Sequence, residues 1–246
     1  MGLGKKVAAT IIFGSGTLIC AQAGFWQLRR KKWKESLIEE RSQHLNDKPY
    51  IVSDDFHPWE KDPEYWNFRP IQIKGKFDHS KEMLLLRKYE NRNGYKVVTP
   101  MTTENNKEIL VNRGWIPVDL KPLSKRKEPE GTVEVAGVLR LSEMPSNYMP
   151  KNSPEIGEWY YIDIDEMSKY AGLKNPSNMM IHEINFERSR EVYDGEELTE
   201  IPLKSVKSEL ISWFVMPETH MTYAMFWFSS STICLLFNIL ALLGKF

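Results

Sequence analysis

Two long stretches without a charged residue lie near the two ends of the chain, and nearly all of the charged residues lie between them. The first runs from Val7 to Leu28 and the second from Met221 to Leu243. An α-helix rises about 1.5 Å per residue, so each stretch is long enough to cross the roughly 30 Å hydrocarbon core of a bilayer. A secretory signal has a shorter apolar run, so we expect the first stretch to be a retained anchor. We predict transmembrane helices over residues 7–28 and 220–243, with both termini on one side of the membrane.

Between these stretches the apolar positions alternate with the short period of β-strands. Each run is bounded by Gly, Pro, Asn or Asp, which is typical of antiparallel strands joined by turns. The predicted strands are Ile71–Phe77, Met83–Arg87, Tyr95–Thr99, Ile109–Asn112, Val133–Leu139 and Met179–Phe186. A short helix is predicted over Asp165–Ala171, with Asp163 or Asp165 as its N-cap and Gly172 just past its end. The predicted fold class is a membrane α+β protein: two transmembrane helices flank one β-rich domain, an antiparallel sheet or a barrel, over residues 49–219.

A basic segment joins the first apolar stretch to this domain. Residues 29–48 begin with a cluster of cations and then place Trp33, Leu37 and Ile38 on one helix face. We therefore predict a juxtamembrane basic helix that continues to about Leu45, before Pro49 begins a loop.

The charge balance of the middle segment differs from that of the whole chain, which has 33 basic and 33 acidic residues. Eight basic residues lie outside residues 35–219, which leaves 25 there against all 33 acidic residues. A domain with this negative balance is unsuited to nucleic acid, so we expect no nucleic-acid partner.

Cysteine and histidine positions bear on metal chemistry. The two cysteines, Cys20 and Cys234, lie inside the predicted spans, so neither a disulfide nor a thiolate metal site is expected in the domain. The domain's histidines do not have the spacing of a zinc or iron site, and most are expected to be solvated or to lie at the edge of the core: His44, His57, His79 and His182.

Several blocks, in order along the chain, carry a resemblance to a known family. They are the juxtamembrane block Gly24–Lys34, then Gly75–Glu82, Tyr95–Pro100, Ile109–Pro117, Asn152–Glu155 with Trp159 and Tyr161, and finally His220, Tyr223 and Trp227. Together they resemble the Surfeit locus protein 1 family, the assembly factors of cytochrome c oxidase. The chain departs from the family pattern at Glu218, where members usually carry Asn, and at Glu187–Pro202, an acidic loop in place of a Gly-rich one.

The resemblance also implies a location and partners. It implies a multi-pass protein of the mitochondrial inner membrane, with both termini in the matrix and the domain in the intermembrane space. The implied partners are the catalytic subunit of cytochrome c oxidase, other assembly factors and membrane lipid. The basic cluster after the first span, against Lys5 and Lys6 before it, would by the positive-inside rule place the domain in the matrix instead. We follow the resemblance, because a domain of this size is translocated largely regardless of loop charge.

His220 is the candidate cofactor ligand. It stands where the second span begins, and Tyr223 and Trp227 follow three and seven residues later on the same helix face. Histidine is a common axial ligand of haem iron. The resemblance adds haem a binding by bacterial relatives, so haem a is the expected transient cofactor, with both aromatic rings beside it. The alternative is a histidine at the membrane interface within an ordinary belt of aromatic residues.

A second group, Trp26, Gln27, Arg30 and Trp33, is expected at the membrane interface. Tryptophan anchors a helix at the headgroup level, while arginine pairs with lipid phosphates or with haem propionates. Anchoring is the preferred interpretation.

Glycines mark two further positions. Gly16 and Gly24 recur with Cys20 every four residues, which predicts a narrow helix face that another helix can approach; the alternative is the ordinary glycine content of membrane helices. In the domain, Gly114 is expected to permit a turn at a strand end, and Arg113 to pair with a carboxylate.

The predicted function is a non-enzymatic, chaperone-like assembly factor that acts in maturation of the oxidase catalytic subunit, at haem a insertion. The alternative is a haem-independent membrane scaffold that stabilises early assembly intermediates. Asp163 and Asp165 have the spacing of a catalytic pair of acids, but helix capping explains them, and no nucleophile or metal site is expected nearby, so no enzyme is expected.

Overall fold

The computed structural model describes residues 3–52, 57–188, 198, 200–213 and 215–245. The chain forms two compact units: residues 1–40 with 212–246, and residues 41–211. Most of the predicted loop Glu187–Pro202 lies outside the described residues.

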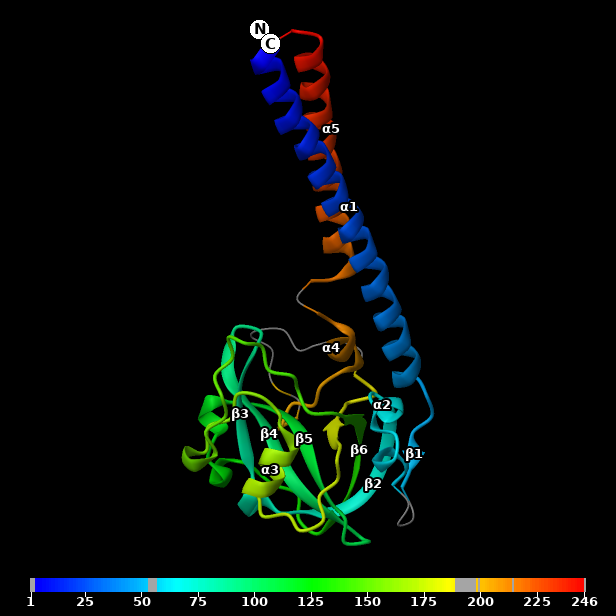
Figure 1. Ribbon diagram of the computed structural model, residues 1–246. Coiled ribbons are helices and arrows are strands. Elements are labelled where there is room, and N and C mark those ends of the chain that lie inside the picture. The colour runs from blue at the N-terminus through cyan, green and yellow to red at the C-terminus, as the bar shows by residue number, and fades with distance from the viewer. Residues whose placement is uncertain (1–2, 53–56, 189–197, 199, 214, 246) are drawn as a thin grey trace. The chain divides into compact units, whose positions relative to one another are not determined.

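The first unit is a pair of long helices, α1 (Leu3–Leu45, with its last turn in the second unit) and α5 (Pro217–Leu242). Both are long and apolar enough to be candidate membrane spans. The helices run antiparallel, so the start of α1 and the end of α5 lie at one end of the pair (Figure 1). α1 is uninterrupted through the predicted span and the predicted basic helix, and it ends at Leu45 as expected.

The second unit is a small β-barrel with short helices, which confirms the predicted fold class of two apolar helices flanking a β-rich domain (Figure 1). Its elements are β1 (Tyr50–Ile51), α2 (Pro63–Trp66), β2 (Pro70–Phe77), β3 (Met83–Tyr89), β4 (Arg92–Thr103), β5 (Glu108–Pro117), β6 (Thr132–Arg140), α3 (Ile164–Tyr170), β7 (Met180–Glu183) and α4 (Lys207–Ile211). Every predicted strand is present, and most are longer than predicted.

The barrel closes because β2 pairs with both β6 and β4, which completes the ring β2–β6–β7–β5–β4. A closed ring with an odd number of strands cannot be antiparallel throughout. One neighbouring pair must be parallel, and that pair is β5 with β7. The sheet is therefore mixed rather than purely antiparallel.

Three apolar clusters lie in the described part of this domain, and the two larger ones pack on most of the barrel strands. The first is formed by side chains from all five ring strands, which places it inside the barrel: Ile71, Ile73, Met101, Ile109, Val111, Val135, Leu139 and Ile181, with Trp59 and others. The second lies on the outer face, where Ile164 and Met167 of α3 pack against β3, β4, β5 and β7. Of the two predicted caps of α3, Asp163 is the one used: its carboxylate accepts a hydrogen bond from Glu166 N at 3.0 Å.

Gly114 lies inside β5 and not at its end, so the predicted strand-ending turn is wrong. The pairing of β4 with β5 shifts by one residue here, which makes Arg113 the extra residue of a β-bulge. Gly114 has φ +126°. Beyond it β5 no longer pairs with β7, and Trp115 pairs with Leu203 instead. The predicted partner of Arg113 is confirmed: its guanidinium forms an ion pair with Glu128.

Candidate functional site

α1 and α5 pack along a seam, and the first three buried residues of α5 follow one another at spacings of three and four residues, which places them on one helix face. The buried residues of α5 are Pro217, His220, Ala224 and Ala241. Side chains from the two helices meet along this seam. The rings of Phe25 and Phe228 meet edge to face at 5.1 Å, and those of Phe13 and Phe237 stack at 5.4 Å.

The glycine face predicted on α1 is confirmed by these contacts. A Cβ atom at Gly24 would lie 2.7 Å from the Phe228 ring, and one at Gly16 would lie 3.2 Å from Cys234 Sγ. Both glycines therefore face α5, and a side chain at Gly24 would force the Phe228 ring or the helices themselves to shift.

One polar contact crosses the seam near the start of α5. His220 Nδ1 lies 2.6 Å from Gln27 Oε1, and both side chains are buried. Because a carboxamide oxygen only accepts hydrogen bonds, the shared proton belongs to His220 Nδ1. The other ring nitrogen, Nε2, then carries a lone pair; it is shielded from solvent, and it has no hydrogen-bond partner among the residues that the structure describes.

This arrangement has the chemistry of a metal-ligating imidazole. Histidine ligands usually donate the hydrogen on one ring nitrogen to a carbonyl or carboxylate oxygen while the other nitrogen binds the metal. His220 would thus be able to hold a metal ion, such as haem iron, through Nε2. Since Nε2 is covered, a ligand can reach it only after the side chains over it move.

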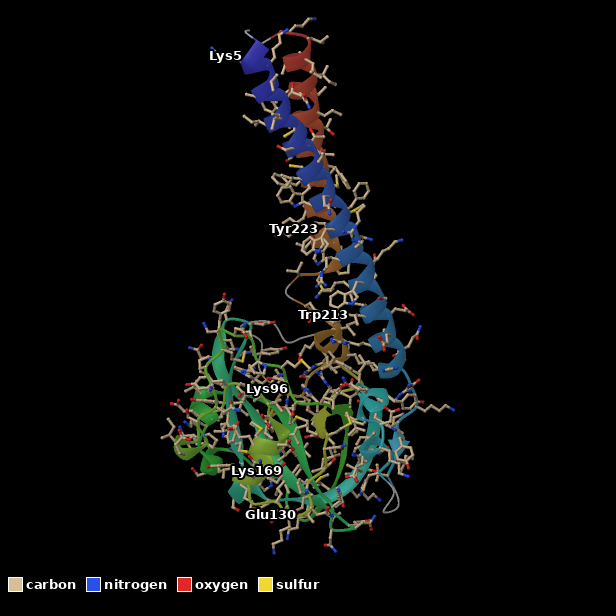
Figure 2. All side chains as sticks on the ribbon, viewed as in Figure 1. Lys5, Lys96, Glu130, Lys169, Trp213 and Tyr223 are labelled. Carbon is tan, nitrogen blue, oxygen red and sulfur yellow. The ribbon has the colours of Figure 1, made fainter. Side chains whose placement is uncertain are left out.

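The two aromatic residues predicted beside His220 differ in their positions. Tyr223 is 48% exposed and projects from α5, where it is labelled in Figure 2, whereas Trp227 is half-buried and contacts the Phe226 ring. Trp227 therefore lies closer to the seam than Tyr223.

Among the four residues predicted at the membrane interface, Gln27 is the exception: the structure brings it together with His220. Trp26 and Trp33 are about half exposed, and Arg30 lies with its guanidinium carbon 4.0 Å from the Trp33 ring centroid. These three form an aromatic and cationic surface, as a headgroup-level anchor would.

Trp213, which was not among the predicted site residues, extends this surface. Lys34 Nζ lies 4.6 Å from the Trp213 ring centroid and 5.9 Å from that of Trp33, so its ammonium is held between indole rings. Trp213 is labelled in Figure 2. The sequence signal that was available is a tryptophan only a few residues before the second span.

A second polar cluster lies on the outer face of the barrel. His182 Nε2 lies 3.0 Å from Ser205 Oγ and 3.5 Å from Asn112 Nδ2. The amide nitrogen of Asn112 only donates, so His182 Nε2 accepts, which requires a neutral imidazole. His182 is buried, unlike the solvated or core-edge position expected for most of the domain's histidines.

The electrostatics of this cluster follow from burial and from two neighbouring cations. Burial holds the pKa of His182 well below its usual 6.5, and Lys96 and Arg140 lower it further. Burial likewise lowers the pKa of Lys96, and it lowers that of Arg140 to about 10 with a contribution from Arg41. Lys96 lies on the part of the barrel next to α4, whose Glu209 partly offsets its shift (Figure 2).

Comparison with known proteins gives a consistent family match. The SURF1 family profile matches residues 16–232. Surfeit locus protein 1 of Gallus gallus is 36% identical over 169 residues, which cover 61% of this chain and 53% of that protein. The Arabidopsis thaliana protein of the same name is 28% identical over 281 residues, which cover 93% of this chain and 75% of that protein. The Homo sapiens protein is 34% identical over 169 residues, which cover 61% of this chain and 55% of that protein. The chain spans about half the length of the vertebrate relatives named here.

Proposed function

The chain belongs to the SURF1 family, and from this premise we propose that it is a non-enzymatic assembly factor for cytochrome c oxidase. Its step is maturation of the oxidase catalytic subunit, at the insertion of haem a. The helix pair holds haem at the membrane while the barrel domain docks on the nascent subunit. Haem a is then cargo that the protein receives and passes on.

The observation that supports a haem step is the buried, unpaired Nε2 of His220. A buried polar atom without a partner is costly to a folded protein, commonly about 1–3 kcal/mol. An iron atom at this position would satisfy it. Tyr223 and Trp227, one and two turns along α5, supply aromatic surface for the ring of the cargo.

The cover over Nε2 suits a protein that must release what it binds. With one protein ligand and a closed resting seam, haem contact requires the seam to open. Closing the seam again restores the packing between α1 and α5 and so favours release. Tight, permanent haem binding is not expected from this arrangement.

The test is the visible spectrum of the full chain purified in detergent from cells that make haem a. Co-purified haem is expected with the wild-type protein, and it should be lost in His220→Ala. Tyr223→Ala and Trp227→Ala should lower haem occupancy less, because neither removes the iron ligand. Leu236→Ala, at an exposed position of the same helix, is the matched control and should keep its haem.

A second candidate function is a scaffold that stabilises early oxidase intermediates without haem. The His220–Gln27 hydrogen bond favours it, since a buried polar contact between two helices also holds the pair together without any ligand. A haem-free wild-type protein, together with full complementation of oxidase activity by His220→Gln, would make the scaffold the better account.

For location, we propose the mitochondrial inner membrane, with both termini in the matrix and the domain in the intermembrane space. The two apolar helices and family membership support a membrane protein. Protease added to mitochondria with ruptured outer membranes should then digest the region between the two spans, residues 35–219, while the spans stay protected. Digestion only after the inner membrane is opened would place the domain in the matrix.

A further inference from the structure

The contact between His220 and Gln27 joins residues that are far apart in sequence and lie on different helices. It is also a contact between two buried side chains: Gln27 is 9% and His220 7% exposed. Neither side chain can therefore exchange this partner for water without opening the seam.

The chemistry of the contact is directional. The oxygen of Gln27 faces Nδ1 of His220, so the imidazole keeps its proton on Nδ1 and leaves Nε2 bare. Without an acceptor at this position, a neutral histidine can place its proton on either nitrogen, and the tautomer with the proton on Nε2 cannot bind a metal through Nε2. The ring is also free to rotate when the contact is lost.

From this geometry we infer that Gln27 is a positioning residue, which holds His220 in the tautomer that presents the Nε2 lone pair as a ligand. The identity of that ligand as haem iron rests on the proposed function. The tautomer of His220 does not depend on the proposed function, and it can be measured on protein that contains no haem.

The inference gives Gln27 a role apart from its neighbours on α1. Trp26 and Trp33 are exposed, whereas Gln27 faces α5 three residues after Gly24, on the same side of the helix. A glutamine used for anchoring at the membrane surface would instead face lipid or water.

The first experiment is nitrogen NMR of the full chain, labelled with ¹⁵N-histidine and reconstituted in lipid nanodiscs without haem. In the wild-type protein, His220 should show a protonated Nδ1 and a bare Nε2. Gln27→Met, which keeps the length of the side chain but has no comparable acceptor, should give a mixture of tautomers. Gln27→Glu keeps an acceptor oxygen and should restore the wild-type pattern.

The second experiment measures the affinity of the same proteins for ferric protoporphyrin IX by optical titration. Loss of the orienting partner of a metal ligand typically weakens binding about 10–100-fold, and that loss is expected for Gln27→Met. Gln27→Glu should bind within a few-fold of wild type. Gln22→Met, an exposed glutamine on the same helix, is the matched control and should change neither the tautomer nor the affinity.

The two experiments separate the failure of this inference from the failure of the proposed function. A wild-type His220 with its proton on Nε2, or a tautomer unchanged in Gln27→Met, would overturn the role of Gln27 even if haem binds. A wild-type protein that binds no porphyrin but shows the expected tautomers would overturn the haem step and leave the positioning of His220 by Gln27 supported. If Gln27→Met does not insert or fold, the tautomers of wild type and Gln27→Glu still decide, because both must show protonated Nδ1.

Discussion

Gly24 of α1 lies against the ring of Phe228 of α5, so closely that a Cβ atom at position 24 would sit 2.7 Å from a ring carbon. Gly24→Leu should therefore push the two helices apart. Overpacking of a close contact costs about 1–3 kcal/mol. We expect a lower thermal midpoint of the helix pair in detergent and weaker crosslinking between cysteines engineered on α1 and α5.

The chain offers a matched control for this substitution. Gly4 is on the same helix and has no atom near the position of an added Cβ, so Gly4→Leu should leave the helix pair intact. Gly24→Leu combined with Phe228→Ala should recover part of the loss, because it removes the ring that the new side chain strikes. An equal effect of Gly4→Leu and Gly24→Leu would show that packing at Phe228 is not the cause.

The helix pair was largely predictable from sequence, and the reason is physical. Uncharged stretches of this length have few stable alternatives to a helix, and the glycine face was visible as a four-residue repeat at Gly16, Cys20 and Gly24. The partner of each residue on the other helix was not predictable. It depends on the register of α1 against α5, which the pattern of either helix alone does not contain.

Gly114 is the second glycine at which an added side chain would be severe. A Cβ atom there would lie 2.3 Å from the backbone oxygen of Leu203, and φ is +126°. Gly114→Ala should cost several kcal/mol because it combines backbone strain with a backbone clash. Chemical denaturation of the full chain, monitored by tryptophan fluorescence, measures this loss.

A substitution at Gly131 distinguishes the cost of backbone strain from the cost of the clash with Leu203. Gly131 also has a positive φ, +75°, but nothing lies near the position of its Cβ. Gly131→Ala should therefore report the cost of backbone strain alone, about 1 kcal/mol. A similar loss in Gly114→Ala and Gly131→Ala would contradict the clash with Leu203.

Glu82 and Arg126 form an ion pair with almost no exposed surface, joined through both carboxylate oxygens at 2.5 and 3.2 Å. Removing one partner leaves a buried charge without its counter-ion, which typically costs about 3–5 kcal/mol. We expect Glu82→Ala to be near the lower figure, because Glu128 also lies 3.4 Å from Arg126. The free energy of unfolding of the barrel domain within the full chain is the measurement.

The neighbouring residue provides the comparison. Lys81 pairs with Asp78 at 3.6 Å on the surface, where such a pair contributes about 0–1 kcal/mol. Lys81→Ala should therefore hardly change the midpoint of denaturation. If Lys81→Ala and Glu82→Ala were equally destabilising, burial of the Glu82–Arg126 pair would not be the cause.

The candidate site was only partly predictable, because its decisive contact is between helices. The sequence alone groups Gln27 with Trp26, Arg30 and Trp33 at the membrane interface, because these residues lie close together in the motif that begins at Gly24. Only the register of the two helices joins Gln27 to His220. The barrel was predicted from alternating strands, but its closure through the β2–β4 pairing and the bulge at Gly114 depend on long-range pairings that local patterns do not specify.

The buried cluster around His182 predicts how stability depends on pH. The folded protein keeps His182 neutral because burial lowers its pKa well below 6.5, with Lys96 and Arg140 adding to the shift. In the unfolded chain the same residue takes up a proton as the pH falls through about 6.5. The unfolded state then binds more protons than the folded state, so the free energy of unfolding falls as the pH is lowered through this range. The slope from one such group approaches about 1.4 kcal/mol per pH unit.

His182→Gln should remove this part of the pH dependence while keeping a polar group beside Ser205. The measurement is denaturation of the full chain at about pH 7.5 and about pH 5.5, a window centred on the unfolded pKa of about 6.5. Wild type should lose more stability between these values than His182→Gln.

Glu183 contributes to the pH dependence in the opposite sense, because burial raises its pKa. It does so in both proteins, so His182 is reported by the difference between the two slopes of stability against pH and not by either slope alone. His44→Gln, at a half-buried position outside the cluster, is the comparison for replacing a histidine elsewhere in the domain. Equal slopes for wild type and His182→Gln would mean that the folded protein accepts a proton on His182 as readily as the unfolded chain, and the neutral, hydrogen-bonded imidazole between Ser205 and Asn112 would have to be abandoned.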